Sequence, residues 1–294
     1  MDERDWLAQR FQEHRPRLRA VAYRMLGSTS EADDAVQEAW IRLSRSKAAE
    51  IDNLQAWLVT VVGRVALNML RSRKTRREEP LEAHLPDPIV DRAEGIDPEH
   101  EALLADSVGL ALLVVLETLT PAERLAYVLH DMFSVPFDEI GAILERSPEA
   151  ARQLASRGRR RIRAADTTPD ANEAAHQEVV EAFLAAARDG DFDALVAVLD
   201  PDIVVRGDWG SGTIVEVRGA ENVARRAMAA SQRDGLVVRP ALINGAAGWV
   251  SVLDGEVYAI GALTLQNGRI TTMDILLDPA RLARLDLADF DSRL

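Results

Sequence analysis

The chain has 294 residues, of which 47% are apolar and 28% charged, as is typical of a folded globular protein of about two or three domains. It contains no cysteine, which excludes disulfides, thiolate catalysis and cysteine-ligated metal sites. No apolar run is long enough to cross a bilayer, and the N-terminus lacks the apolar segment of a signal peptide. We therefore expect a soluble, cytoplasmic protein.

The net charge of −13, taken alone, argues against nucleic-acid binding. The charge is unevenly distributed, however, because residues 166–294 carry 11 basic against 21 acidic side chains. The basic residues of the first half gather in two stripes, six between Arg64 and Arg77 and seven between Arg146 and Arg163. These stripes predict two local phosphate-binding surfaces on an otherwise acidic protein.

Residues 5–77 carry three runs of apolar residues at helical spacing, which predict three helices. The first run ends at Gly27, and the serine- and acid-rich segment 28–34 that follows is typical of a helix N-terminus. Asp52-Asn53 precedes the third run and is expected to cap its helix, which ends in the first basic stripe.

Residues 101–165 are also expected to be helical. Thr120 and Glu123, with proline between them, form a capping-box pattern that predicts a helix start. Two short helices joined by a tight turn at Glu145–Ser147 then predict a helix-turn-helix. Beyond residue 172, strand-like runs separated by Asp-Gly and Asn-Gly pairs predict an α+β domain with a meandering antiparallel sheet.

The expected fold is therefore multidomain, with two all-α modules followed by an α+β domain. Four prolines between positions 80 and 98 deny the segment between the helical modules a continuous helix. The expected boundaries are a first helical module over 1–79, a linker over 80–100, a second helical module over 101–165 and the α+β domain over 173–294.

Three segments of the helical half resemble, in order, parts of the extracytoplasmic-function (ECF) group of bacterial RNA polymerase sigma factors. The first segment, STSEADDAVQEAWIRL, resembles the helix by which these factors bind the clamp of the polymerase. The second, NLQAWLVTVVGRVALNMLRSRK, resembles the region-2 helix that binds the promoter −10 element. The third, LTPAERLAYVLHDMFSVPFDEIGAILERSPEAARQLASRGRRRIR, resembles the region-4 helix-turn-helix that reads the −35 element. The C-terminal half resembles the SnoaL-like, NTF2-type cone, a combination represented by the SigJ-type factors.

That subgroup often carries a Trp-Leu-Pro-Glu-Pro motif in its linker, where this chain has His84-Leu85-Pro86-Asp87-Pro88. The subgroup's Asp-Gly-Gly-Gly-Lys motif is matched in part by Asp208-Trp209-Gly210-Ser211-Gly212-Thr213. Its Asn-Pro-Asp-Lys-Leu motif is matched by Asp278-Pro279-Ala280-Arg281-Leu282, which keeps the proline, one base and the leucine.

Promoter opening requires bases to be drawn out of the stack and held near cations that bind phosphates. The third expected helix offers such groups, and by resemblance the loop before it, from about Lys47 to Asn53, is a base pocket. The candidate −10 residues are Arg64, Asn68, Arg71, Arg73, Lys74, Arg76 and Arg77. The alternatives are a solvated basic face and, in the last turn, cations that stabilise the helix dipole. We expect Trp57 in the core rather than as a stacking platform.

In a helix-turn-helix, the first residues of the second helix contact base edges, whereas phosphate contacts position the protein. Arg pairs with guanine, Gln with adenine and Glu with cytosine. The candidates for reading bases at −35 are therefore Glu149, Arg152, Gln153 and Ser156. Arg157, Arg159, Arg160, Arg161 and Arg163 suit phosphates. The alternative is a basic surface helix without groove contact. Gly158 costs about 1 kcal/mol relative to Ala within a helix, which indicates a close approach to a neighbouring segment.

Four polar residues share an outward face near the start of the second expected helix, and by resemblance they contact the polymerase. These residues are Asp33, Asp34, Gln37 and Glu38. The alternative is ordinary stabilisation of the helix N-terminus by acids, and both interpretations can hold together.

NTF2-type cones usually have an open apolar mouth. The candidates for a pocket or for regulatory contacts are Leu85, Pro86, Pro88, Asp208, Trp209, Trp249, Tyr258 and Asp274, with Phe183 and Glu256 as further lining. No histidine follows His176, so the His-assisted base of many relatives is missing. We expect a regulatory or interaction module, with sensing of an unknown small ligand as an alternative. The histidines show no metal-ligand spacing, and we expect neither a metal nor a cofactor.

The resemblance implies a dissociable polymerase subunit that is not an enzyme, is monomeric when free, and has core RNA polymerase and promoter DNA as partners but no membrane partner. We expect the acidic C-terminal domain to regulate it in cis, because its charge complements the two arginine-rich stripes. One alternative is a SnoaL-type small-molecule-binding or isomerase- or hydrolase-like enzyme with an attached DNA-binding module. Another is a one-component DNA-binding regulator that does not use polymerase.

Overall fold

The computed structural model describes residues 3–46, 51–76, 85–93, 95–97, 100, 104, 109–165, 173–210, 213–288 and 290. The chain divides into two compact units. The first unit comprises Met1–Pro80, Pro98–Asp106 and Leu113–Asp166, and the second comprises Leu81–Asp97, Ser107–Leu112 and Thr167–Leu294. Among the described helices, none combines the length and the apolarity needed to cross a bilayer.

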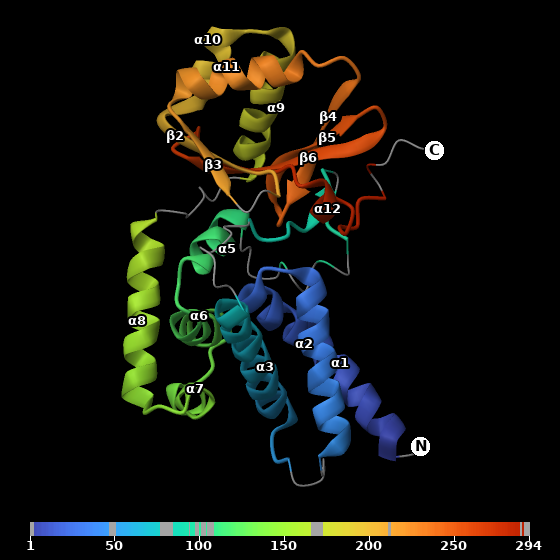
Figure 1. Ribbon diagram of the computed structural model, residues 1–294, viewed down its shortest axis with the longest axis vertical. Helices are drawn as coiled ribbons and strands as arrows, with labels where there is room; N and C mark the ends of the chain where they lie inside the picture. Colours follow the sequence, from blue (N-terminus) through green and yellow to red (C-terminus); the bar gives the residue numbers. More distant parts are fainter. Residues whose placement is uncertain are drawn as a thin grey trace. The chain divides into compact units, whose positions relative to one another are not determined.

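The first unit begins with three long helices, α1 (Glu3–Leu26), α2 (Thr29–Arg45) and α3 (Leu54–Arg76), as the apolar spacing predicts (Figure 1). The Ser28 hydroxyl accepts from the backbone N–H of Glu31 and caps α2. Asn53 caps α3 by accepting from the backbone N–H of Ala56 at 3.1 Å. Polar caps of this kind satisfy donors that a helix start otherwise leaves without partners.

A second group of helices completes the unit. It contains α6 (Pro121–Tyr127), a π-helical turn (Val128–Met132), α7 (Phe137–Leu144) and α8 (Pro148–Ala164). Before them, α5 (Leu110–Glu117) contributes its first residues to the second unit and the rest to this one. The Thr120–Glu123 capping box is present, and α7 and α8 form the expected helix-turn-helix, whose turn contains Glu145 in the left-handed conformation.

Gly158 lies where α8 approaches α6. A Cβ added there would lie 3.2 Å from Cβ of Tyr127 and 3.5 Å from the carbonyl oxygen of Glu123. The glycine therefore allows the basic helix to pack closely on its neighbour, which is the close approach that its position within a helix indicates.

The two helical groups pack against each other. A Cβ at Gly63 of α3 would lie 3.4 Å from Cδ1 of Leu129. Arg124 of α6 is only 2% exposed, and its Nε donates to the carbonyl oxygen of Arg24 in α1 at 3.0 Å. Because a buried guanidinium requires acceptors, this bond holds the two groups together as one packed unit.

The second unit contains one seven-stranded sheet with the order β1-β4-β5-β6-β7-β2-β3. Its strands are β1 (Val90–Arg92), β2 (Leu199–Asp208), β3 (Ile214–Arg218), β4 (Leu236–Ile243), β5 (Ala246–Leu253), β6 (Glu256–Gln266) and β7 (Arg269–Leu276). All neighbours are antiparallel except β2 and β7, which are parallel. The expected antiparallel sheet is wrong at this pair, because a long crossover returns the chain beside β2 in the same direction.

Both predicted hairpin turns are present. Asp254 and Gly255 have φ values of 51° and 85°, and Asn267 and Gly268 have values of 51° and 71°. Two successive residues with positive φ are typical of the type I′ turn, whose twist matches that of the flanking strands. These turns connect β5 to β6 and β6 to β7.

Strand β1 comes from the segment expected to be a linker. Its three residues pair with residues 241–243 of β4. An edge strand requires hydrogen bonds on one side only, so the prolines that precede β1 do not prevent the pairing. This short segment has no alternating apolar pattern, so the sequence alone does not predict the strand.

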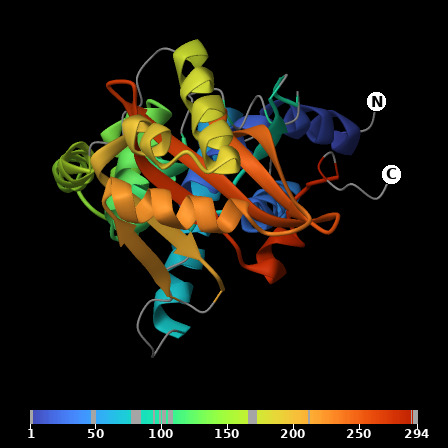
Figure 2. The same ribbon diagram turned by 90° about the horizontal axis from the view of Figure 1, so that it is seen from above.

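Three helices, α9 (Glu173–Asp189), α10 (Phe192–Val198) and α11 (Ala220–Ser231), cover one face of the sheet (Figures 1 and 2). A short α12 (Pro279–Leu282) follows β7. Phe183 and Trp249 meet in the core with ring centroids 5.9 Å apart. A Cβ at Gly261 of β6 would lie 2.2 Å from the Trp249 ring, so the indole requires glycine on the neighbouring strand. This is the α+β architecture expected from the resemblance.

Candidate nucleic-acid interface and linker clamp

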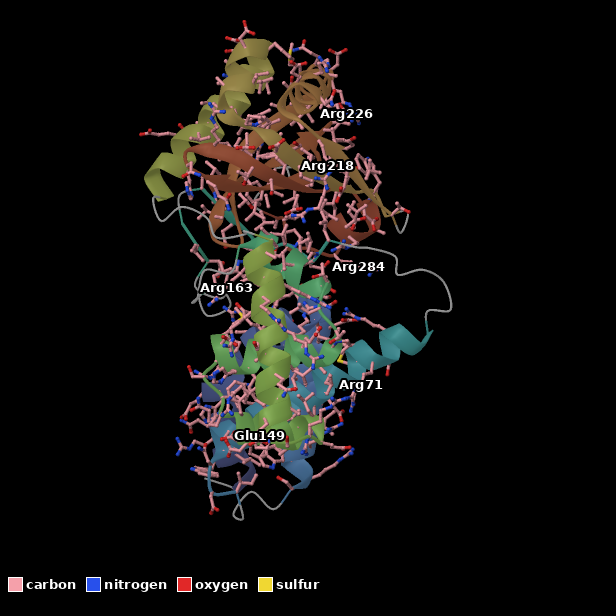
Figure 3. All side chains as sticks on the ribbon, turned by 90° about the vertical axis from the view of Figure 1, so that its left-hand side faces the viewer. Arg71, Glu149, Arg163, Arg218, Arg226 and Arg284 are labelled. Atoms are coloured by element: carbon pink, nitrogen blue, oxygen red, sulfur yellow. The ribbon has the colours of Figure 1, made fainter. Side chains whose placement is uncertain are left out.

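The outward face of α8 carries the candidates for reading the −35 element. The buried residues of this helix, among them Ala151, Leu154 and Ala155, form its inner face. Those exposed to solvent include Glu149, Arg152, Gln153, Ser156, Arg157, Arg160 and Arg161. Figure 3 shows Glu149 near one end of α8 and Arg163 near the other. The helix therefore presents a continuous polar and cationic face while its apolar face packs on the helix-turn-helix.

Local contacts set the charge of one candidate base-reading side chain and the orientation of another. Hydrogen bonds from the Glu149 backbone amide and the Ser147 hydroxyl lower the pKa of the Glu149 carboxyl. The carboxylate is therefore an acceptor only, which suits the amino group of cytosine. The guanidinium of Arg152 lies 5.1 Å from the ring centroid of Phe137, a cation–π contact that orients an otherwise flexible side chain.

Some arginines of α8 already have protein partners. Arg159 pairs with Asp131 at 2.8 Å, and Arg161 donates to Glu123 at 3.2 Å and to the carbonyl oxygen of Thr118 at 3.3 Å. Within the described part of the chain, Arg157 and Arg160 form no ion pair with a carboxylate. The same holds for the exposed Arg163, so these three are the phosphate candidates most available to an incoming anion.

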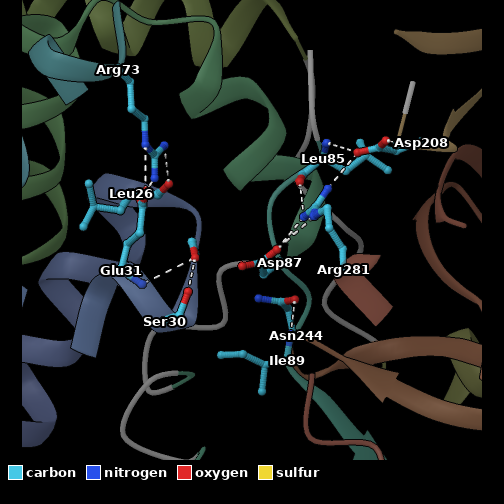
Figure 4. A network of polar contacts seen from close by, with 12 residues as sticks. Leu26, Ser30, Glu31, Arg73, Leu85, Asp87, Ile89, Asp208, Asn244 and Arg281 are labelled. Atoms are coloured by element: carbon cyan, nitrogen blue, oxygen red, sulfur yellow. Dashed lines mark hydrogen bonds and ion pairs between the residues drawn. The ribbon is translucent and has the colours of Figure 1, made fainter. Parts of the chain in front are cut away.

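The −10 candidates on α3 fall into three groups. Arg64, Asn68 and Arg71 are exposed, and Figure 3 labels Arg71 on this helix. Arg73 is half-buried, ion-pairs with Glu31 of α2 and donates to the carbonyl oxygen of Leu26 (Figure 4). The side chains of Lys74, Arg76 and Arg77 lie outside the described residues.

A hollow of about 490 Å³ lies beside the start of α3, next to the loop that the resemblance implies is a base pocket. It is lined by Ser46, Ile51, Asp52, Asn53, Ala56, Trp57, Thr60 and Glu139. Trp57 is half-buried rather than fully in the core, so one part of its indole faces this hollow. Residues 47–50 of the same loop lie outside the described residues.

The polymerase candidates lie on α2. Asp33 pairs with Arg19 at 2.9 Å and Glu38 with Arg42 at 2.8 Å, whereas Asp34 and Gln37 are exposed. Asp33 and Gln37 also line a groove of about 250 Å³ between α1 and α2, together with the aromatic rings of Phe11 and Trp40. A groove that combines aromatic lining with polar rims is typical of a protein-binding surface.

In the second unit, Arg281 holds residues 85–87 against the domain (Figure 4). Its guanidinium donates to Asp87 Oδ1 at 2.5 Å, to the carbonyl oxygen of Leu85 at 2.6 Å and to Asp208 Oδ2 at 2.7 Å. Asp208 is fully buried, and its Oδ2 also accepts from the backbone N–H of Leu85 at 3.0 Å. We call Arg281, Asp208 and Asn244, which bind residues 85–89, the linker clamp.

Asn244 extends the clamp toward β1. Its side-chain oxygen accepts from the backbone N–H of Ile89 at 3.2 Å, and its own backbone N–H donates to the carbonyl oxygen of Ile89 at 2.8 Å. Leu85, Pro86, Pro88 and Ile89 are buried. The sequence resemblance singled out the motif containing Arg281 but gave no sign of Asn244, because a turn asparagine is usually explained by backbone conformation alone. Of the motif residues, His84 lies outside the described part of the chain.

The C-terminal domain contains a cavity of about 390 Å³ between α9, α11 and the sheet. Trp209, Trp249 and Tyr258 line it, but Asp208 and Asp274 do not. Asp274 is instead buried against Arg206, with which it forms two hydrogen bonds of 2.6 and 3.0 Å. Burial raises the pKa of the Asp274 carboxyl, and the attraction of Arg206 opposes this.

The comparisons with known proteins agree with this geometry. Residues 10–76 match the family Sigma-70 region 2, and residues 109–162 match Sigma-70, region 4. The chain is 37% identical to the ECF RNA polymerase sigma factor SigJ of Mycobacterium tuberculosis, over 92% of this chain and 91% of that protein. It is 33% identical to the probable ECF RNA polymerase sigma factor SigI of the same organism, over 96% and 97% of the two chains.

The crystal structure of Mycobacterium tuberculosis SigJ superposes with a TM-score of 0.76 at 34% identity, and the match covers 95% of this chain and 99% of that one. The similarity therefore includes the C-terminal domain as well as the two sigma regions. Sigma factors are initiation subunits that bring core RNA polymerase to promoter DNA and are not enzymes. The chain belongs to the family of ECF RNA polymerase sigma factors.

Proposed function

We propose that the C-terminal domain regulates promoter initiation in cis by holding the linker between regions 2 and 4. The linker clamp carries this proposal, because Arg281, Asp208 and Asn244 bind the backbone of residues 85–89. Charged and amide side chains that bind backbone groups away from water give strong, directional contacts. The clamp therefore controls a segment through which the two sigma regions are joined.

The length of the linker, compared with the distance between the promoter elements, supports a regulatory role for this segment. Elements about 25 base pairs apart, at about 3.4 Å per base pair, are separated by about 85 Å. A fully extended chain of residues 77–109 spans at most about 120 Å. Binding both elements therefore uses most of the reach of the linker. A domain that holds residues 85–89 through the linker clamp and residues 90–92 in its sheet determines whether that reach is available.

Packing within the first unit supports the same proposal. Arg64 of α3, a −10 candidate, donates to the carbonyl oxygen of Ala142 in α7 at 3.1 Å. Glu139 of α7 lines the hollow beside Asn53. Regions 2 and 4 thus contact each other through surfaces that include promoter candidates, and we propose that they separate when the holoenzyme binds DNA in the cytoplasm. In that open form, α3 would help to open the −10 region and the exposed face of α8 would read the −35 element.

Run-off transcription with purified core polymerase tests the regulatory role. Arg281→Met removes the clamp, and Arg284→Met is the matched control because Arg284 is exposed three residues further on (Figure 3). We expect Arg281→Met to raise promoter-specific transcript at limiting polymerase several-fold and Arg284→Met to leave it unchanged. Equal transcription by the wild type, Arg281→Met and a chain truncated after residue 166 would refute regulation in cis without affecting the family assignment.

Co-purification with core polymerase tests the partner surface separately. Replacing Asp33, Asp34 and Glu38 together by the corresponding amides should abolish binding, whereas the same change at the exposed Glu178 and Glu181 of α9 should not. A one-component regulator that does not use polymerase would show no binding even as wild type.

A further inference from the structure

The cavity of the C-terminal domain has the size of a small-molecule site. Its volume of about 390 Å³ lies in the range of ligand pockets, which is about 300 to 1,000 Å³. The walls are mainly apolar, with Phe183 and Leu184 from α9, Val223 and Ala227 from α11, and Met273 from β7. Such walls favour an apolar body that leaves water.

The opening of this cavity is both apolar and cationic. Trp209 and Val215 line it while remaining 47% and 43% exposed, which is unusual for large apolar side chains without a covering partner. Arg226 of α11 and Arg233, in the loop after α11, also line the cavity and are exposed. Figure 3 shows Arg226 on this helix. The exposed lining residues mark the mouth, and two of them are arginines.

Neither arginine has an anionic partner among the described residues. Arg233 donates instead to the hydroxyl of Tyr258, and its guanidinium lies 5.1 Å from the centroid of that ring. Arg225, the neighbour of Arg226, does pair with Glu221 at 3.6 Å and does not line the cavity. The helix therefore neutralises one arginine internally and leaves a positive charge at the mouth.

The described lining contains no carboxylate and no histidine. Alternation along β2 and β7 explains this, because Gly207, Trp209, Met273 and Ile275 line the cavity and the acids between them point to the other face. Asp208 is held there by Arg281 and Asp274 by Arg206. A cation entering the mouth would find no counter-ion in the described lining, whereas an anion would find two guanidinium groups.

From this charge pattern we infer that the cavity binds an apolar organic anion, with its body between α9, α11 and the sheet and its acidic group at Arg226 and Arg233. Arginine suits this role because its planar fork binds carboxylates through two hydrogen bonds. The exposed Trp209 indole and the Tyr258 ring would flank the point where the head group leaves the apolar body. This site does not depend on whether the domain regulates transcription.

Isothermal titration calorimetry on the full chain tests the inference with probes that differ in head group. Decanoate and naphthoate supply the anion on a straight-chain and an aromatic body, decanol is the neutral probe and decylamine the cationic one, all below their aggregation limits. We expect an anion to bind at least about tenfold more tightly than decanol, and decylamine most weakly; a tenfold ratio corresponds to about 1.4 kcal/mol. The stronger of the two anions identifies the body that the cavity prefers. Equal affinities for all head groups, or no binding of any probe, would overturn the inference.

Variants locate the bound probe. Arg226→Gln with Arg233→Gln should remove the preference of the anion over decanol while leaving decanol binding unchanged, and Arg225→Gln is the matched control that should retain it. Ala227→Phe, which fills the cavity from α11, should weaken all probes. Binding to Ala227→Phe that equals the wild type would place the ligand elsewhere and contradict the site. The comparison of probes on the wild type remains decisive if a variant fails to fold.

Discussion

Arg281 donates from two nitrogens to a single carboxylate oxygen of Asp87, a residue 194 positions earlier in the chain, at 3.2 and 2.5 Å. The same guanidinium reaches the fully buried Asp208, so one cation neutralises two acids, one from the linker and one from β2. This sharing makes the linker part of the electrostatic balance of the domain. When the linker is released, Asp208 no longer competes with Asp87 for Arg281. Opening the clamp therefore costs less free energy than breaking an isolated buried ion pair.

Loss of the Asp87 carboxylate should loosen the clamp. Asp87→Asn removes a charge-assisted contact worth about 2 kcal/mol, which corresponds to about 30-fold faster exchange of the backbone amide of Leu85 through local opening. Hydrogen exchange measured on the full chain checks this. Amides of the β5–β6 hairpin are the internal control and should keep their rates; an unchanged rate at Leu85 would show that Asp87 does not hold the linker.

Arg206 and Asp274 form a buried pair on adjacent parallel strands. Arg206→Met alone leaves a buried carboxyl without its partner and should destabilise the C-terminal domain by about 3–5 kcal/mol. Adding Asp274→Leu should recover much of this loss, since an apolar pair avoids the desolvation cost of both charges. Denaturant unfolding of the single and double variants measures the coupling free energy between the two residues. If the stability losses of the two single variants simply add in the double variant, the residues are not coupled and the prediction is wrong.

The sequence predicted those features whose signals are local. The Asn-Gly and Asp-Gly turns, the caps at Ser28 and Asn53 and the polar face of α8 all follow from residues a few positions apart, and the helical modules and α+β domain follow from their periodicity. The parallel β2–β7 pair and strand β1 depend on contacts between distant segments, which no local pattern encodes.

The same distinction applies to the candidate site. Residue type marked Arg73 as a DNA contact, but α2 places Glu31 beside it, and a sequence alone does not tell a cation that binds phosphate from one that binds a neighbouring helix. Likewise, Asp208 and Asp274 have the chemistry of pocket acids, but β-strand alternation directs them away from the cavity. The family motif indicated Arg281, although its three acceptors became evident only from the fold.

Arg152 and Arg160 should affect promoter binding in different ways. Arg152 lies near the start of α8 over Phe137, and Arg152→Ala should reduce discrimination between the natural −35 element and a base-substituted one by about 1–3 kcal/mol. Arg160 lies farther along the exposed face, so Arg160→Ala should weaken all sequences alike and lower the salt dependence by about one phosphate contact. Holoenzyme binding to both promoters over a salt series measures the two effects. Retained −35 preference in Arg152→Ala would rule out its base contact.

Gly158 should not accommodate a β-branched side chain, because a Cβ there would already lie 3.2 Å from Cβ of Tyr127 and 3.5 Å from the carbonyl oxygen of Glu123, neither of which can rotate away. Gly158→Val should push α8 away from α6 and cost about 1–3 kcal/mol through overpacking, despite the loss of a glycine from the helix interior. Ala164→Val is the matched control, since Ala164 is exposed in the last turn of the same helix. Thermal unfolding and −35 binding should both decline in Gly158→Val and remain near wild type in the control. Equal stability of the two variants would mean that α8 adjusts to the added volume and that close packing on Tyr127 does not fix the recognition helix.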